Sequence, residues 1–308
     1  MQPNPKIKVV GVGGSGSNTI SRMLRDGIQG IDLIAINTDA QALCFCKAEK
    51  KVLIGENVTR GLGAGMDVSL GRRAAEESRQ KIEEVLRGAN MVFITCGCGG
   101  GTGSGASPII AEVSKNLGIL TIAVVTRPFS FEGEQRKGVA NSAIEKLRDK
   151  VDALLVISND KLLCLIDNKT TVNNAFWICD GVLRDAVRGI TDLVVLPGIV
   201  SVDMASILAI MKNAGKALFG VGKSKGGKRA LEAAQQAINS PLLDSSISGA
   251  KKVLFNVSGQ DLGLAEVSEV AKIITKTADS KAQVIFGAVR DPKVKKGEIK
   301  VTVIAAGF

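Results

Sequence analysis

Short apolar runs alternate with longer amphipathic stretches along the chain, up to about residue 170. The amphipathic stretches at 71–87 and 138–150 have apolar residues at helical spacing, and the apolar runs between such stretches have the length of buried strands. The predicted strands are 7–12, 33–36, 52–54, 91–95, 119–126 and 153–157. This alternation predicts an α/β domain with a mostly parallel sheet that helices cover on both faces.

The pattern changes after this region. Residues 173–191 carry apolar side chains over so wide a helical face that we expect a helix packed between two layers. The helices predicted beyond it are 204–214, 229–238 and 265–276, and the strands are 253–257, 284–289 and 300–305. This order fits a smaller α+β domain. The predicted division is 1–172, 173–191 and 192–308.

A glycine-rich run at 99–105, Gly-Gly-Gly-Thr-Gly-Ser-Gly, separates the predicted strand 91–95 from a helical stretch that opens near Pro108. Without large side chains, successive backbone N–H groups can converge on an anion, and the following helix adds its positive end. Thr102 and Ser104 would add hydroxyl donors. A flexible linker is the alternative, but linkers rarely join a buried strand to a helix. The run therefore indicates a phosphate cradle.

A second glycine-rich run lies at 11–18, between the strand 7–12 and a helix expected to start near Thr19. It fits the dinucleotide fingerprint G-x-G-x-x-G, and Asp39 could be the acidic residue that this fingerprint requires. Taken alone, it would suggest a nicotinamide or flavin enzyme. Two cradles in one domain suggest instead a polyphosphate that is held from both sides.

The glycine run at 99–105 resembles the signature loop of the tubulin/FtsZ family. The resemblance continues through nearly the whole chain, at 37–39, 61–65, 127–133 with Arg136, 158–162 and 301–308. Within the family it lies nearest to FtsZ, the cell-division GTPase of prokaryotes and plastids, because 308 residues is short for a tubulin. The resemblance implies a Rossmann-like GTPase domain, a long central helix and a smaller α+β C-terminal domain. It also implies GTP-dependent assembly into head-to-tail filaments, with GTP hydrolysed between adjacent subunits.

The resemblance also implies the residues of a GTP site. Those expected at the phosphates are Gly13, Gly14, Ser15, Gly16, Ser17, Ala64, Gly65, Gly100, Gly101, Thr102 and Gly103. Those expected at the ribose and base are Glu132, Arg136, Asn18, Asn159, Phe176 and Asp180. Mg²⁺ would be held mainly through the phosphates and water, as this hard ion often is. GTP and GDP are thus the expected ligands.

The chemistry of Asp180 fits guanine. A carboxylate can accept hydrogen bonds from both N1–H and the N2 amino group of guanine, a pattern that adenine does not offer. Phe176 precedes Asp180 by one helical turn and would stack on the base. A solvated carboxylate and a core aromatic are the alternative interpretations, and the two glycine runs favour the guanine role.

The hydrolytic residues of the family lie on a loop of the form Asn-x-Asp-Phe-Ala-Asp, which reaches the nucleotide of the neighbouring subunit. Here residues 201–206 read Ser-Val-Asp-Met-Ala-Ser, so Asp203 is kept while Ser201 and Ser206 replace the Asn and the second Asp. The loss of a positioned general base costs about 10²- to 10⁴-fold in rate. We therefore expect Asp203 and Ser206 to support only slow turnover. The alternatives are a GTP-binding structural polymer or co-assembling paralogue with little hydrolysis and, more distantly, a dinucleotide-dependent oxidoreductase.

Composition narrows the chemistry. The chain has no histidine, which excludes Ser-His and Cys-His nucleophiles. Its cysteines are Cys44, Cys46, Cys96, Cys98, Cys164 and Cys179. Their C-x-C spacing does not match common zinc sites, so we expect buried, apolar thiols and no metal site. A Walker A-like stretch at 217–224 follows a predicted helix rather than a strand, and we interpret it as a basic loop.

The net charge and the two ends of the sequence indicate which partners and which location to expect. The net charge is +10, with many of the lysines in the C-terminal part. This surface could attract anionic membrane or an acidic partner, although a dispersed solvated surface is the favoured interpretation, and no specific nucleic acid is expected. The family binds division adaptors through a C-terminal tail, which this sequence lacks. With no long apolar run and no secretion signal, we expect the cytoplasm at the division site, with a plastid stroma as the alternative.

Overall fold

The structure is a computed structural model that describes residues 5–28, 30–163, 170–195, 198–200, 202–240 and 246–308. The chain forms two compact units, Met1–Val187 and Arg188–Phe308. Their boundary falls inside the long helix α9 (Val172–Val195), which contains the predicted central helix. The bounds of the three predicted segments stay a prediction.

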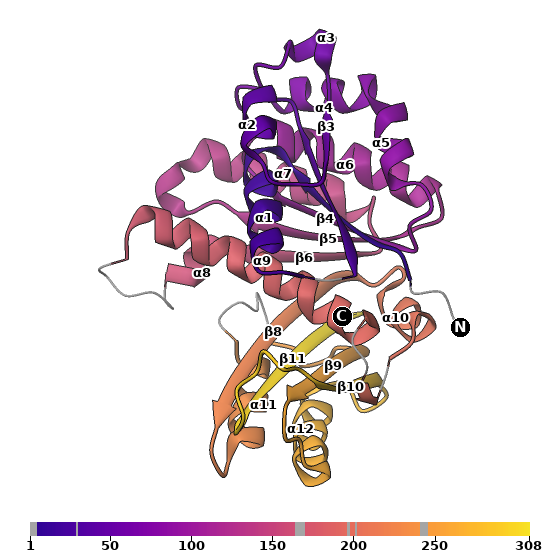
Figure 1. Cartoon of the computed structure of the whole chain (residues 1–308), viewed down its shortest axis with the longest axis vertical. Coiled ribbons are helices and arrows are strands. Elements are labelled where there is room, and N and C mark those ends of the chain that lie inside the picture. Colours follow the sequence, from indigo (N-terminus) through magenta and orange to yellow (C-terminus); the bar gives the residue numbers. More distant parts are fainter. Residues whose placement is uncertain (1–4, 29, 164–169, 196–197, 201, 241–245) are drawn as a thin grey trace. The chain divides into compact units, whose positions relative to one another are not determined.

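The first unit is built on a parallel sheet with the strand order β3-β2-β1-β4-β5-β6 (Figure 1). The strands are β1 (Ile7–Val12), β2 (Ile31–Asn37), β3 (Lys50–Leu53), β4 (Met91–Gly97), β5 (Leu120–Arg127) and β6 (Ala153–Ser158). All the strands predicted for this part are confirmed, and the observed ends differ by one or two residues. Because β1 pairs with β4, the two glycine-rich runs that follow them are neighbours at the carboxyl edge of the sheet.

Helices cover both faces of this sheet, as predicted (Figure 1). They are α1 (Gly13–Arg25), α2 (Ala40–Phe45), α3 (Glu56–Thr59), α4 (Val68–Glu77), α5 (Arg79–Leu86), α6 (Gly101–Asn116), α7 (Glu134–Arg148) and α8 (Asn159–Leu163), with a 3₁₀ turn η1 (Ser130–Glu132). The single helix predicted at 71–87 is wrong, because α4 and α5 are separate at Ser78. The buried Ser78 hydroxyl accepts a hydrogen bond from the N–H of Gly55 (2.9 Å), just before α3.

Both helices that follow the glycine-rich runs begin earlier than predicted. α1 starts at Gly13 rather than near Thr19, and α6 starts at Gly101 rather than near Pro108. Glycine and proline disfavour helix interiors, so local propensity places the starts too late. The glycines are therefore the first turns of the two helices rather than loops that precede them.

Packing explains why α6 tolerates these glycines. A Cβ on Gly105 would lie 2.3 Å from the carbonyl oxygen of Val68, and one on Gly71 would lie 2.3 Å from that of Gly101. Both distances are far below van der Waals contact, so the backbones of α4 and α6 approach too closely for any side chain. Tertiary contact therefore overrides helix propensity at the start of α6.

The second unit contains a mixed sheet with the strand order β8-β11-β9-β10-β7. Its strands are β7 (Gly198–Val200), β8 (Gly215–Lys225), β9 (Lys252–Gly259), β10 (Gln283–Arg290) and β11 (Glu298–Ala306). Its helices are α10 (Met204–Met211), α11 (Arg229–Ile238) and α12 (Leu264–Thr277). β9 and β10 are parallel and the other pairs are antiparallel, which confirms the α+β character of this part.

The Walker A-like stretch at 217–224 is neither a P-loop nor the basic loop that we expected. It lies inside β8, and residues 217–225 of that strand pair with β11. Its glycines allow α11 to approach: a Cβ on Gly220 would lie 2.0 Å from the carbonyl oxygen of Ala237, and one on Gly222 would lie 2.0 Å from that of Ala233. Helix packing therefore accounts for these glycines.

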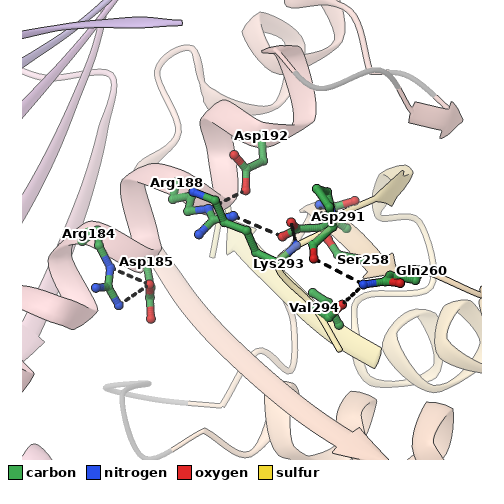
Figure 2. Close-up of polar contacts among 11 residues, drawn as sticks. Arg184, Asp185, Arg188, Asp192, Ser258, Gln260, Asp291, Lys293 and Val294 are labelled. Carbon is green, nitrogen blue, oxygen red and sulfur yellow. Dashed lines mark hydrogen bonds and ion pairs between the residues drawn. The ribbon is translucent and has the colours of Figure 1, made fainter. Parts of the chain in front are cut away.

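The end of α9 is joined to the end of β10 by ion pairs within the second unit. Figure 2 shows Arg188 between two carboxylates, with its Nε donating to Asp192 (3.0 Å) and its Nη2 to Asp291 (3.2 Å). Burial raises the pKa of Asp192, and the neighbouring positive charge of Arg188 opposes this rise. β10 also pairs with β7, so the end of α9 and β7 both contact the same part of the second unit.

Two of the basic residues in the C-terminal part do not contribute to an exposed surface. Arg229 is 9% exposed and pairs with Asp261 (2.9 Å) and Glu266 (2.6 Å), and Lys300 is 7% exposed. Exposed basic residues of this part include Lys223, Lys225, Lys228, Lys251, Lys293, Lys295 and Lys296. The expected basic surface is thus smaller than the sequence suggests.

We expect Gly105→Ala to destabilise the protein by about 1–3 kcal/mol, the usual cost of overpacking, because its methyl group would meet the backbone of α4. Gly138→Ala is the matched control, since Gly138 is an exposed helical glycine of α7 with open space at its Cβ position. This control should gain about 0.5–1 kcal/mol. Thermal and urea unfolding measure both changes, and equal stability of the two variants would contradict the packing argument.

Candidate functional site

A cavity of about 630 Å³ in the first unit opens at the carboxyl edge of the sheet. Most of the residues predicted for a nucleotide line it: Gly13, Gly14, Ser15, Asn18, Ala64, Gly65, Gly100, Gly101, Thr102, Gly103, Glu132, Arg136, Asn159, Phe176 and Asp180. Gly16 and Ser17 are not part of the lining. The volume lies within the range of about 300–1,000 Å³ that is typical of small-molecule sites.

The first turn of α1 forms one wall of this cavity. The first backbone N–H groups of any helix have no partner within the helix. In α1 no side chain caps them either. Gly13 has a positive φ of 72°, and a Cβ there would lie 3.0 Å from the backbone nitrogen of Gly103. Gly14 has open space at its Cβ position, so an anion can approach its backbone closely. The positive end of α1 therefore faces the cavity.

Gly16 has a different part from the one predicted. A Cβ there would lie 2.6 Å from the carbonyl carbon of Gly11 and 2.7 Å from the carbonyl oxygen of Thr95. Gly16 thus allows α1 to pack directly on the ends of β1 and β4. Its contribution to the cavity is indirect, because it sets the position of the turn that bears Gly13 and Gly14.

The first turn of α6 forms the opposite wall. Gly100 is its N-cap residue and provides no side-chain cap, so a second set of unpaired N–H groups points into the same cavity. The Thr102 hydroxyl forms a hydrogen bond with that of Thr38 (2.6 Å), which holds the turn against the end of β2. The Ser104 hydroxyl accepts from the N–H of Gly99 (2.9 Å) and is outside the cavity lining, so the predicted donor role of Ser104 is wrong.

Asp180 of α9 lies at another side of the cavity. Its side chain is 9% exposed; one oxygen accepts from the Thr19 hydroxyl (2.9 Å) and the other pairs with Arg22 Nη1 (2.9 Å). Burial raises the pKa of Asp180 to about 6, although the charge of Arg22 and the hydrogen bond from Thr19 act in the opposite direction. Asp180 is therefore a carboxylate at neutral pH. Its two oxygens are buried hydrogen-bond acceptors in the cavity wall.

Other side chains complete this end. Phe176 is 38% exposed and meets Phe129 edge-on, with ring centroids 5.4 Å apart, so it is a wall of the cavity rather than a core aromatic. Asn159 lines the cavity with a buried Oδ1 that has no partner among the described residues. A buried acceptor without a donor is costly, which favours a ligand that donates to it. Glu132 is ion-paired to Arg136, one turn along.

Sequence reasoning missed Arg22 and Thr19, the two residues that hold Asp180. Arg22 lies one helical turn after Asn18 on α1, so the i, i+4 spacing could have indicated that both face the same cavity. Asp39, the acidic residue of the dinucleotide interpretation, caps α2 by accepting from the N–H of Ala42 (2.9 Å). Its carboxylate therefore already has a structural partner.

Two family profiles match the chain. The profile of the Tubulin/FtsZ family, GTPase domain, matches residues 6–167, and the profile of the FtsZ family, C-terminal domain, matches residues 215–308. The chain belongs to the tubulin/FtsZ family. The resemblance inferred from the glycine runs and the shorter motifs is thereby confirmed.

Solved structures agree with this assignment. An empty FtsZ dimer from M. jannaschii is 45% identical, with a TM-score of 0.95, and the match covers 100% of this chain and 89% of that one. A mutant of the M. jannaschii FtsZ is also 45% identical, with a TM-score of 0.94 and coverage of 99% and 91%. CetZ2 from Haloferax volcanii, solved as a GTPγS-bound protofilament, shares the fold at 20% identity, with a TM-score of 0.83 and coverage of 98% and 93%. The chain thus has a GTPase-family fold of cytoskeletal type.

The residues that we expect to act in hydrolysis lie at the start of α10. Asp203 is the N-cap residue, and its carboxylate accepts from the N–H of Ser206 (2.7 Å). Hydrogen bonds from Ser206 lower the pKa of Asp203, so this exposed group is a carboxylate at neutral pH. Ser201 lies outside the described residues. The first carboxylate of the family's loop is therefore present, and a neutral hydroxyl stands at the position of the second.

The cysteines only partly match the expectation of buried thiols. Cys46, Cys96, Cys98 and Cys179 are buried, but Cys44 is exposed, and Cys164 lies outside the described residues. No cluster of three or more His, Cys, Asp or Glu side chains that could hold a metal ion occurs in the described part of the chain. No helix in that part is long and apolar enough to cross a membrane.

The raised pKa of Asp180 predicts a specific dependence of stability on pH. The folded protein binds the Asp180 proton with a pKa of about 6, whereas the ordinary value is 3.8. Folding therefore becomes less favourable as this group ionises, by about 3 kcal/mol at most, since each pKa unit is worth about 1.4 kcal/mol. Relative to the wild type, Asp180→Asn should gain stability as the pH rises from about 4 to about 7 and stay level above that.

Urea unfolding of the ligand-free protein at several pH values measures this difference. Asp32→Asn, which removes an exposed carboxylate, is measured alongside as the control. If Asp180→Asn instead loses stability relative to the wild type as the pH rises, Arg22 and not burial dominates the pKa of Asp180.

Proposed function

We propose that this chain binds GTP and polymerises head-to-tail into filaments that serve cell or organelle division. The observation that carries the proposal is the convergence of two uncapped helix N-termini, those of α1 and α6, on one cavity that also contains Asp180 and Asn159. Two positive helix ends suit a multiply charged phosphate chain, and buried acceptors suit a base that donates hydrogen bonds.

The phosphates would lie between the two helix starts. Backbone N–H groups around Gly14 and Ser15 would bind from one side and those around Gly101 and Thr102 from the other, with Ala64 and Gly65 near the terminal phosphate. The glycines matter because the Cβ positions of Gly14 and Gly65 are open, whereas a Cβ on Gly101 would lie 2.9 Å from that of Ala64. The ion pair of Glu132 and Arg136 would face the ribose and an adjacent phosphate.

Asp180 would select guanine. Its carboxylate would accept from N1–H and the N2 amino group, and the unpartnered Oδ1 of Asn159 would accept from a further donor on the base or sugar. In this structure Arg22 holds one oxygen of Asp180, so binding would exchange that contact for the base. In ATP, N1 of adenine carries no hydrogen, so the buried Asp180 carboxylate that faced it would lack a donor. This disfavours ATP.

The residues present also fit Mg²⁺. The described residues contain no cluster of protein ligands for a metal ion, so Mg²⁺ would be held mainly through the phosphates and water. The ion would neutralise negative charge on the phosphates. At the phosphates, the chain itself would provide the two helix N-termini and the surrounding polar side chains.

Hydrolysis would take place between adjacent subunits. Asp203, at the start of α10, would reach the terminal phosphate of the next subunit and orient the attacking water. Two similar structures support assembly of this kind, because one is an FtsZ dimer and the other is a CetZ2 protofilament. Because Ser206 has no charge at neutral pH, we expect slow turnover and long-lived filaments. A structural polymer or co-assembling paralogue with little hydrolysis is the limiting form of the same proposal.

Division adaptors are further partners in this proposal, and the exposed lysines of the second unit could contact anionic membrane or an acidic partner. The proposed location is the cytoplasmic face of a division site, or the equivalent site in a plastid stroma. The dinucleotide-dependent oxidoreductase remains the distant alternative: Asp39 lines the cavity, but one oxygen of its carboxylate caps α2.

We expect Asp180→Asn to weaken GTP binding by about ten- to a hundredfold, the effect of losing a charged hydrogen-bond acceptor, and to leave the weaker ATP binding nearly unchanged. Titration calorimetry with GTP and ATP measures both. Asp32→Asn is the control and should keep the preference for GTP. If the wild type binds both nucleotides equally, the assignment of the base-reading residue is wrong.

We expect Ser206→Asp to raise the rate of phosphate release above the critical concentration for assembly by about tenfold or more, toward the 10²- to 10⁴-fold that a positioned acid–base group provides. Position 206 is the third residue of α10, and a negative charge is tolerated there because it lies at a helix N-terminus. Ser248→Asp adds the same charge at an exposed position elsewhere and should have no effect.

Sedimentation with GTP and with GDP, followed by phosphate release from the same samples, separates assembly from turnover. Assembly with GTP but negligible release by the wild type would identify the structural polymer. Rapid release by the wild type, unchanged in Ser206→Asp, would show that the serine does not limit hydrolysis.

A further inference from the structure

A second cavity of the first unit lies beside the proposed nucleotide site. It has a volume of about 300 Å³, and its lining is Asn18, Ser21, Arg22, Arg25, Lys47 and Trp177. The four residues from α1 follow the spacing i, i+3, i+4, i+7, so they form one face of that helix. Lys47 follows α2, and Trp177 belongs to the part of α9 that lies in the first unit. Helix α1 contacts both of these elements (Figure 1).

Hydrogen bonds fix the walls of this cavity. The N–H of Lys47 donates to the Ser21 hydroxyl (3.2 Å), and that hydroxyl donates to the Cys46 sulfur at the end of α2 (3.3 Å). Arg22 Nη1 donates to the carbonyl oxygen of Phe176 (3.3 Å), which holds the first part of α9 against α1. The three walls are therefore held together by direct contacts.

The lining carries an excess of positive charge. Three of its six residues are cationic, and none is acidic. Arg25 and Lys47 are exposed, and among the described residues their side chains have no ion-pair or hydrogen-bond partner. Arg22 pairs with Asp180 on the side of the other cavity. Because a cleft lined by one sign of charge concentrates counter-ions, this cavity favours an anionic ligand.

The aromatic wall indicates a second part of the ligand. Trp177 is 48% exposed and lines the cavity. An exposed aromatic ring beside cations is a typical platform on which a planar base stacks. The volume lies at the lower end of the range typical of small-molecule sites, so one ring with one phosphate group fits better than a base with a polyphosphate. A nucleoside monophosphate has this chemistry.

Arg22 connects the two cavities. It lines both of them, as Asn18 does, and its guanidinium holds one oxygen of Asp180 (2.9 Å). Guanine at Asp180 would displace this contact and leave Arg22 without its carboxylate, so Arg22 could then pair with an anion in the second cavity. An anion that binds first would draw Arg22 away from Asp180. Each ligand would therefore favour the binding of the other.

We propose that the second cavity is a ligand site for a small organic anion that joins a phosphate group to a planar ring, and that its occupation strengthens guanine nucleotide binding through Arg22. The coupling rests on the proposed function. The site itself does not, because Arg25, Lys47 and Trp177 lie outside the cavity assigned to GTP.

Intrinsic fluorescence tests the site directly, because Trp177 is the single tryptophan of a chain that has no tyrosine. The probe is cytidine 5′-monophosphate, whose ring nitrogen N3 carries no hydrogen and so does not suit Asp180. We expect it to quench Trp177 with half-saturation at or below about 1 mM. Cytidine and inorganic phosphate each provide one half of the ligand, and each should bind about tenfold more weakly or less.

The same titration with saturating GDP and Mg²⁺ tests the coupling. With GDP bound, the probe should bind about fivefold more tightly, which is at the lower end of the coupling typical between two sites. Because coupling is reciprocal, the probe should raise the affinity for GDP by the same factor, and titration calorimetry measures this.

Charge variants locate the probe. Arg25→Gln and Lys47→Gln should each weaken probe binding by about three- to tenfold, the effect of losing one charged contact at an exposed position. Both should bind GDP as the wild type does when the probe is absent. Lys146→Gln is the matched control, since it removes the same charge from an exposed position of α7 and should leave probe binding unchanged.

Three results would overturn the site: no quenching of Trp177 and no heat at millimolar probe, competition between the probe and GDP, or equal weakening by Arg25→Gln and Lys146→Gln. Competition would place the probe in the cavity of Asp180. Probe binding that leaves GDP affinity unchanged would overturn the coupling through Arg22. If the protein binds no GDP, the proposed function fails instead, and the titration of the ligand-free protein still decides whether the site exists.

Discussion

The structure depends on the close approach of two helix starts that have no side chains between them. α1 and α6 both begin in glycine, follow neighbouring strands of a parallel sheet, and lack side-chain caps. A Cβ on Gly13 would already lie 3.0 Å from the backbone of Gly103. Backbone amides from two helices can therefore surround one anion, which neither helix could do alone.

The rest of the first unit supports this approach. Gly16 lets α1 pack on the strand ends, Gly105 lets α6 pack against α4, and the Thr38–Thr102 hydrogen bond ties α6 to the end of β2. The cavity also contains a buried carboxylate, Asp180, whose high pKa shows how poorly it is solvated. A ligand with an anionic part and a hydrogen-bond-donating part matches both features.

Much of this was predictable from the sequence. The parallel strands followed from the alternation of apolar runs, and the cavity lining followed from the family motifs. The helix starts were placed too late, because propensity scores glycine as a helix breaker, while here tertiary contact requires it. Ser104 looked like a phosphate donor, but a local turn uses its hydroxyl. Arg22 was missed because its partner, Asp180, is 158 residues away in the sequence and only the fold brings them together.

The central claim is that both helix starts bind one ligand at the same time. Amide hydrogen exchange, measured with and without GTPγS and Mg²⁺, tests it most directly. The account predicts that binding slows exchange at the amides of 14–17 and of 101–103 together, with the same dependence on ligand concentration. Slower exchange at one of these segments alone would contradict it.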